Sequence, residues 1–199
     1  MKDWTGNMNS IYKTIGASNH TENERQVDDY YATDPIATKL LLEKERFSSL
    51  IWEPACGEGH IAKVFEEQGY KVLATDLIYR GFGQETSRDF LKTELKKPFM
   101  GDIVTNPPYK YAQEFVQKSL DLVEPGHKVA MFLKLTFLEG QKRRELFDKY
   151  PPKVVYVFSK RVACAMNGDF KNISSSAVAY AWFVWEKGYT GEPVIRWIN

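Results

Sequence analysis

The tetrad Asn106-Pro107-Pro108-Tyr109 has the residue types and spacing that point most directly to chemistry. Two consecutive prolines hold the backbone extended, and a residue that precedes a proline avoids the helical region, so the position of Asn106 is restricted. The side-chain oxygen of Asn106 and the carbonyl of Pro107 can then accept hydrogen bonds from an exocyclic amino group, while Tyr109 stacks on the ring that carries it. These bonds raise the electron density of the amino nitrogen toward an electrophile, with no covalent intermediate. The alternative interpretation is a Pro-Pro turn that begins a helix.

Upstream of the tetrad, acidic and glycine residues predict a site for a cationic nucleoside ligand. Glu53 ends an expected strand, and Gly57 and Gly59 allow a tight turn that a ligand can approach closely. The segment is neither a GxGxxG fingerprint nor a P-loop. Asp76 follows Glu53 by 23 positions, where a carboxylate can accept both hydroxyls of a ribose. Asp89-Phe90 could contact an adenine through a hydrogen bond and ring packing, although a surface turn is the better explanation of that pair taken alone.

These residues need a scaffold in which strands and helices alternate. Apolar runs predict strands over residues 49–52, 71–75, 103–105, 129–135, 154–158 and 177–185, with an edge strand over 194–197. Helical patterns cover residues 34–46, 58–68, 111–123 and 139–149, the first capped by Asp34 and Pro35, and a polar loop is expected over 159–176. The order predicts an α/β fold, a Rossmann-like three-layer sandwich whose seven-stranded sheet is mostly parallel with one antiparallel strand. Ligands of such sheets bind at the carboxyl ends of the strands, where the motifs fall.

Composition narrows the classes of function. The chain has 199 residues and 27 basic against 26 acidic side chains, so no global field draws it to a polyanion. Two cysteines and three histidines without ligand spacing predict no metal site and no disulfide framework. Without a long apolar run or a signal peptide, we expect a cytoplasmic protein with no membrane partner. Residues 1–29 are predicted to be a flexible arm, and residues 30–199 a single catalytic domain.

A local basic segment is the candidate nucleic-acid surface. Residues 134–171 contain nine basic side chains, Lys134 being the first, and four acidic ones. Phosphates would be attracted there. The residues that we predict to bind nucleic acid are Lys142, Arg143, Arg144, Lys160, Arg161 and Lys171. For residues 142–144, a solvated helix face is the alternative.

The order and spacing of these segments resemble motifs I to IV of the S-adenosylmethionine-dependent adenine-N6 DNA methyltransferases. Residues 53–59 are similar to motif I, Asp76 to motif II, Asp89-Phe90 to motif III and the tetrad to motif IV, while residues 28–35 resemble motif X. The resemblance covers about residues 20–199 and is greatest to small phage and prophage enzymes. It implies the class I methyltransferase fold, S-adenosyl-L-methionine as the cofactor, and catalysis by Asn106, Pro107, Pro108 and Tyr109. The cofactor-binding residues that it implies are Tyr31, Thr33, Pro35, Glu53, Pro54, Ala55, Gly57, Gly59, Asp76, Leu77, Asp89 and Phe90.

The resemblance thus implies methyl transfer to adenine N6 in DNA. Many family members carry a separate target recognition domain, for which this chain has no room. Loops, the arm, a partner subunit or a second copy of the chain would have to read the target. Alternative hypotheses are an RNA adenine-N6 methyltransferase, a protein glutamine methyltransferase, or a non-catalytic subunit that keeps the fold.

Overall fold

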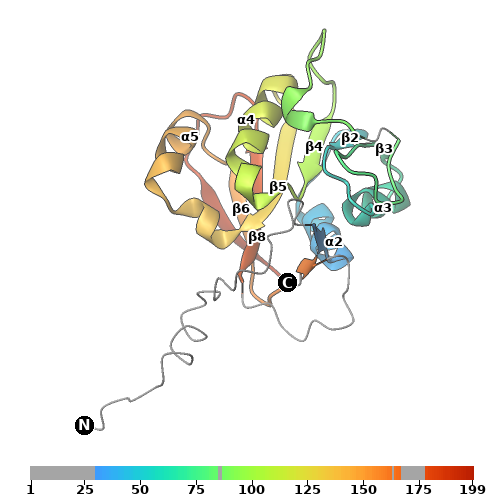
Figure 1. Ribbon diagram of the computed structural model, residues 1–199. Coiled ribbons are helices and arrows are strands. Elements are labelled where there is room, and N and C mark those ends of the chain that lie inside the picture. Colours follow the sequence, from blue (N-terminus) through green and yellow to red (C-terminus); the bar gives the residue numbers. More distant parts are fainter. Residues whose placement is uncertain (1–29, 85–86, 163, 167–177) are drawn as a thin grey trace, which may run out of the picture.

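A seven-stranded mixed sheet is the centre of the computed structural model, which describes residues 30–84, 87–162, 164–166 and 178–199 (Figure 1). The strand order is β3-β2-β4-β5-β8-β6-β9, and only β8 runs antiparallel to its neighbours. The strand bounds are β2 Leu50–Glu53, β3 Lys71–Ala74, β4 Asp102–Thr105, β5 Lys128–Lys134, β6 Val154–Phe158, β8 Tyr180–Glu186 and β9 Val194–Ile198. All seven predicted strands and the single antiparallel direction are confirmed.

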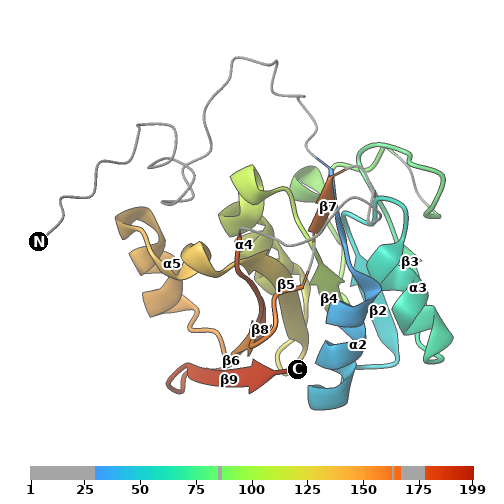
Figure 2. The same ribbon diagram turned by 90° about the horizontal axis from the view of Figure 1, so that it is seen from below.

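Helices cover both faces of this sheet, which gives the three layers that the sequence predicts (Figure 2). On one face lie α2 (Pro35–Lys44) and α3 (His60–Glu67), and on the other α4 (Ala112–Leu122) and α5 (Arg144–Lys149). Short 3₁₀ helices span Phe90–Lys92, Tyr109–Tyr111, Leu135–Leu138 and Gln141–Arg143. The predicted helix over 139–149 is therefore divided between the last of these turns and α5.

The first helix begins where the sequence predicts. Asp34 precedes it, and its side chain accepts a hydrogen bond from the backbone N–H of Ile36 at 3.0 Å. Pro35 occupies the first helical position, where a missing N–H costs nothing. The helix packs through Ala37 and Leu41, which are fully buried. This capping fixes the point at which the chain leaves β1 (Tyr31–Thr33), the strand that precedes the helix.

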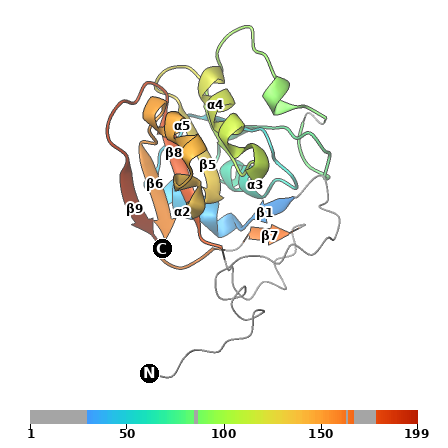
Figure 3. The same ribbon diagram turned by 60° about the vertical axis from the view of Figure 1, so that its left-hand side comes forward.

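A second, two-stranded sheet lies beside the large one and was not predicted. Its strands β1 (Tyr31–Thr33) and β7 (Cys164–Met166) are antiparallel, and Thr33 is paired with Cys164 (Figure 3). The prediction of a loop over 159–176 was wrong for residues 164–166, while residues 167–177 and the predicted arm lie outside the described residues. We call this pair of strands the β1–β7 ribbon.

Among the residues that the structure describes, no helix is long and apolar enough to cross a membrane.

Candidate active site

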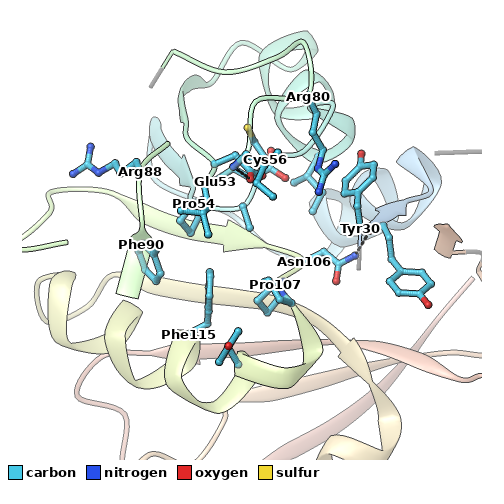
Figure 4. Close-up of a pocket in the computed structure, with 18 of the residues that line it drawn as sticks. Tyr30, Glu53, Pro54, Cys56, Arg80, Arg88, Phe90, Asn106, Pro107 and Phe115 are labelled. Atoms are coloured by element: carbon cyan, nitrogen blue, oxygen red, sulfur yellow. Dashed lines mark hydrogen bonds between the residues drawn. The ribbon is translucent and has the colours of Figure 1, made fainter. Parts of the chain in front are cut away.

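An open cavity of about 740 Å³ lies where β2, β3 and β4 end. It brings together residues from five separate segments of the chain, between residues 30 and 115. Predicted site residues that line it are Tyr31, Thr33, Glu53, Pro54, Ala55, Asp76, Leu77, Asp89, Phe90, Asn106, Pro107, Pro108 and Tyr109. Figure 4 shows Phe90 and Phe115 on one side of the cavity, Tyr30 and Asn106 on the other, and Glu53 and Pro54 between them.

The glycine turn between β2 and α3 lies behind the cavity wall. Gly57 and Gly59 have φ angles of 53° and 79°, in the left-handed region that favours glycine. A Cβ atom on Gly57 would lie 2.1 Å from Cε2 of Tyr30, and one on Gly59 would lie 2.4 Å from Cδ1 of Phe82. The Tyr30 hydroxyl also accepts a hydrogen bond from the backbone N–H of Glu58 at 3.1 Å. The glycines therefore let two aromatic rings close on the turn, instead of lining the cavity themselves.

Glu53 combines a structural contact with an acidic position at the cavity. Its carboxylate is 2% exposed and accepts a hydrogen bond at 2.8 Å from the backbone N–H of Ala62, in the first turn of α3. Gly59 offers this helix no side-chain cap, so Glu53 takes that role from a distance in sequence. Burial raises the pKa of Glu53 well above its usual range, and the negative charges of Asp76 and Glu66 add to the effect. A cation in the cavity would oppose this shift and favour the ionised carboxylate.

Asp76 fastens the end of β3 to the glycine turn. Its two carboxylate oxygens accept hydrogen bonds from the backbone N–H groups of Gly57 and Ile78, at 2.8 and 2.9 Å. Each oxygen has a further lone pair, so the carboxylate can still accept hydrogen bonds from the hydroxyl groups of a ligand in the cavity. Leu77, the next residue, is 54% exposed at the rim.

Asp89 and Phe90 form the far wall. The Asp89 carboxylate pairs with Lys92 at 3.1 Å. Phe90 is buried, with its ring centroid 5.2 Å from that of Trp52 and 4.9 Å from that of Phe115. Phe115 was not predicted to belong to the site. An aromatic wall with a neighbouring carboxylate can hold a purine ring by packing and one hydrogen bond.

Asn106 is held by the β1–β7 ribbon in a defined orientation. Its side-chain nitrogen donates hydrogen bonds to the backbone carbonyl of Tyr31 at 2.8 Å and to the hydroxyl of Thr33 at 3.0 Å. The Cys164 sulfur lies 3.5 Å from the same nitrogen. Because a backbone carbonyl can only accept, the amide nitrogen must face the ribbon. The side-chain oxygen of Asn106 is buried and has no hydrogen-bond partner among the described residues.

Tyr109 packs beside Asn106, and its ring is enclosed by residues that are distant in the sequence. Its hydroxyl lies 3.3 Å from the Cys164 sulfur, and its ring centroid is 5.8 Å from that of Tyr31 and 6.0 Å from that of Tyr180. The ammonium of Lys134 lies over the ring, 4.7 Å from its centroid. Burial, with a smaller effect of Cys164, raises the pKa of Tyr109 far above its usual value, so the hydroxyl stays protonated.

Three residues that sequence reasoning assigned to the site shape the wall without lining the cavity: Pro35, Gly57 and Gly59.

Three other residues at the site were not assigned from the sequence: Tyr30, Cys164 and Phe115. Tyr30 belongs to the segment that resembles motif X, so that resemblance could have singled it out. No sequence signal points to Cys164 or to Phe115, because only the folded chain brings them to the tetrad and to Phe90.

The basic residues that we predicted to bind nucleic acid and that the structure describes do not line the cavity. Arg143 donates hydrogen bonds to the backbone carbonyls of Thr136, Phe137 and Glu139, so its guanidinium closes its own loop. Arg144 pairs with Asp148 on the surface at 2.7 Å. The side chains of Lys142, Lys160 and Arg161 are exposed, and Lys171 lies outside the described residues. A role for these residues in binding nucleic acid stays a prediction.

The part of the chain that the structure describes has no cluster of three or more side chains suited to hold a metal ion.

Comparisons with known proteins identify the fold. No protein-family model matches the chain, and no curated protein matches its sequence. Among solved structures, a class I S-adenosylmethionine-dependent methyltransferase from Listeria monocytogenes matches 94% of this chain and 70% of its own, with 14% identity and a TM-score of 0.59. The chain has the class I methyltransferase fold.

Two restriction-enzyme subunits have the same fold. The modification subunit of a type I restriction enzyme from Vibrio vulnificus matches 94% of this chain and 50% of its own length, with 12% identity and a TM-score of 0.57. The EcoKI M protein, from a type I restriction enzyme, matches 83% of this chain and 45% of its own length, with 16% identity and a TM-score of 0.55. The chain thus spans about half the length of these two subunits.

Proposed function

We propose that the chain is an S-adenosylmethionine-dependent methyltransferase that methylates the N6 amino group of adenine in DNA. The observation that carries this proposal is the arrangement of Asn106. Its nitrogen is anchored by two hydrogen bonds, while its oxygen is buried and has no hydrogen-bond partner in the part of the chain that the structure describes. Leaving a buried acceptor unpaired costs about 1–3 kcal/mol, which an amino group of the substrate would recover on binding.

The cavity has the chemistry that the cofactor needs. Its three carboxylates, Glu53, Asp76 and Asp89, suit a ligand that carries an ammonium, a sulfonium and ribose hydroxyls. The apolar wall at Phe90 and Phe115 suits the adenine of that ligand. When bound, S-adenosylmethionine supplies an electrophilic methyl group. The fold similarity to methyltransferases adds support, although sequence identity to them is low.

The chain's own residues act by holding the acceptor. The side-chain oxygen of Asn106 and the carbonyl of Pro107 accept hydrogen bonds from the two N–H groups of the target amino group, which orients its nitrogen lone pair toward the cofactor half of the cavity. The target nitrogen would form its bond to the methyl carbon as the bond from that carbon to the sulfonium sulfur breaks, and would release one N–H proton to water. Tyr109 stays protonated and neutral, and so offers an aromatic face without a competing nucleophile. Positioning and hydrogen bonding supply the rate enhancement, and no protein side chain forms a covalent bond.

Nucleoside mass spectrometry tests this function. The protein is incubated with isotopically labelled S-adenosylmethionine and, in parallel, duplex DNA, single-stranded DNA and RNA. Label in N6-methyldeoxyadenosine is expected. The Asn106→Ala variant should lose this label while its cofactor affinity, measured by calorimetry, is unchanged. Label only in RNA would move the target to RNA, and label in neither would contradict a nucleic-acid substrate.

A further inference from the structure

The two halves of the site differ in the charges of the side chains that border them. In the cofactor half, Lys92 pairs with the carboxylate of Asp89. Arg80 lies over the ring of Tyr30, and Arg88 over that of Trp52. Among the described residues, the carboxylates that line the cavity belong to this half. Next to the tetrad lie two described lysines, Lys134 and Lys110.

Lys134 is the lysine whose ammonium contacts the tetrad. It ends β5, next to the strand that leads into Asn106, and its side chain is half-buried. Its ammonium rests over the face of Tyr109, and no carboxylate in the described part of the chain pairs with it. Lys110, the residue after Tyr109, is exposed and also makes no ion pair with a described carboxylate. A half-buried cation without a counter-ion favours an anionic ligand at this point.

The same ammonium occupies the place that a target base would take. An aromatic ring offers a cation a contact that is weak at exposed sites, so the flexible lysine stem can leave the ring when another group stacks there. A nucleotide base that stacks on Tyr109 would bring its own phosphates within reach of the displaced ammonium. The ammonium would then exchange a weak contact with the ring for a strong, charge-assisted hydrogen bond to a phosphate.

We propose that Lys134 is a phosphate-binding residue of the acceptor site, whose ammonium covers the Tyr109 ring in the free protein and binds a backbone phosphate beside the target base in the complex. The acceptor is accordingly a nucleic-acid strand, here DNA, and a neutral peptide would leave the lysine uncompensated. This inference depends on the proposed function only in placing the target base on Tyr109.

Oligonucleotide binding tests the inference without turnover. Fluorescence anisotropy is measured with a labelled single-stranded oligodeoxynucleotide that carries one adenine, in the presence of S-adenosylhomocysteine and over a range of salt concentrations. Lys134→Met keeps the apolar stem and removes the charge. It should weaken binding roughly tenfold and reduce the slope of log affinity against log salt by about 0.7 to 1, the loss of one phosphate contact.

Two variants provide the controls. Lys71→Met removes the same charge from an exposed residue at the opposite end of the sheet, where β3 begins, and should leave both quantities unchanged. Lys134→Arg should restore most of the affinity. In wild type, a neutral methylphosphonate on one side of the adenine should weaken binding as much as Lys134→Met does, with no further loss when the two are combined.

The outcomes separate this inference from the proposed function. If Lys134→Met binds with wild-type affinity and salt slope, or if the wild type does not bind the oligonucleotide, the phosphate role is overturned. If binding depends on Lys134 but the wild type transfers no methyl group to adenine, the phosphate site stands and the proposed reaction fails.

Discussion

The Thr33→Val variant isolates the contact that orients Asn106. Thr33 is 2% exposed, and its hydroxyl accepts a hydrogen bond at 3.0 Å from the Asn106 side chain. Valine has nearly the same shape but no acceptor, so the variant removes this bond and leaves the bond to the Tyr31 carbonyl at 2.8 Å. The perturbation therefore loosens the Asn106 amide without opening a cavity.

The size of the effect follows from one neutral hydrogen bond. Such a bond contributes about 0.5–1.5 kcal/mol net. If Thr33 holds the amide in its reactive orientation, that loss appears in the transition state, and kcat/KM for the acceptor should fall about five-fold, since about 1.4 kcal/mol corresponds to a factor of ten. Calorimetry with the cofactor separates this contact from the cofactor-binding role that the resemblance implies for Thr33. The affinity for the cofactor is unchanged if the hydroxyl serves Asn106 alone, and it falls if the hydroxyl also contacts the cofactor.

A matched control is available in the next helix. The Thr38 hydroxyl is buried and has no hydrogen-bond partner among the described residues, so Thr38→Val removes a hydroxyl that makes no such contact with them. We expect wild-type methylation from it, and a free energy of unfolding that is raised by about 1 kcal/mol in urea titration. If Thr33→Val methylates DNA as fast as Thr38→Val does, Thr33 does not orient Asn106 and the reasoning is refuted.

Two further substitutions test the charges and the network that support the site. Because burial raises the pKa of Glu53, the folded protein binds the carboxyl proton more tightly than the unfolded chain does, and the free energy of unfolding should fall as pH rises above about 4.5. In urea titrations across pH, Glu53→Gln should flatten that fall. An unchanged dependence of the free energy of unfolding on pH would contradict the raised pKa of Glu53. On the opposite end of the sheet, the hydroxyl of Tyr156 donates to Glu45 at 2.6 Å. Tyr156→Phe should lower the free energy of unfolding by about 1.5–3 kcal/mol, the range for a bond to a charged group, with methylation per folded molecule unchanged; a loss below about 0.5 kcal/mol would show that the bond contributes little.

Strong local signals explain why the large sheet was predictable. The strand at Val129–Leu133 is an unbroken apolar run, and all five of its residues are buried between two helical layers. The signals for α2 are equally local, because Asp34 and Pro35 are adjacent to the helix that they begin. Where a residue type and its immediate neighbours decide the structure, the sequence was sufficient.

The β1–β7 ribbon shows where such reasoning stops. Each of its strands has three residues, and the partners Thr33 and Cys164 are separated by 131 positions, so no local pattern signals their pairing. A loop was a reasonable prediction for the polar segment that contains β7. The contact of Glu53 with the backbone of Ala62 was not predicted for the same reason, because a helix cap that comes from another element cannot be recognised from the sequence of the helix itself.

Residues 30–33 link the two halves of the site. Tyr30 closes on the glycine turn at the cofactor side, while the carbonyl of Tyr31 and the hydroxyl of Thr33 hold Asn106 at the acceptor side. These contacts come from one short segment, in which Tyr30 directly precedes strand β1. The glycine turn and the Asn106 amide belong to parts of the chain that are distant in sequence, and this segment contacts both.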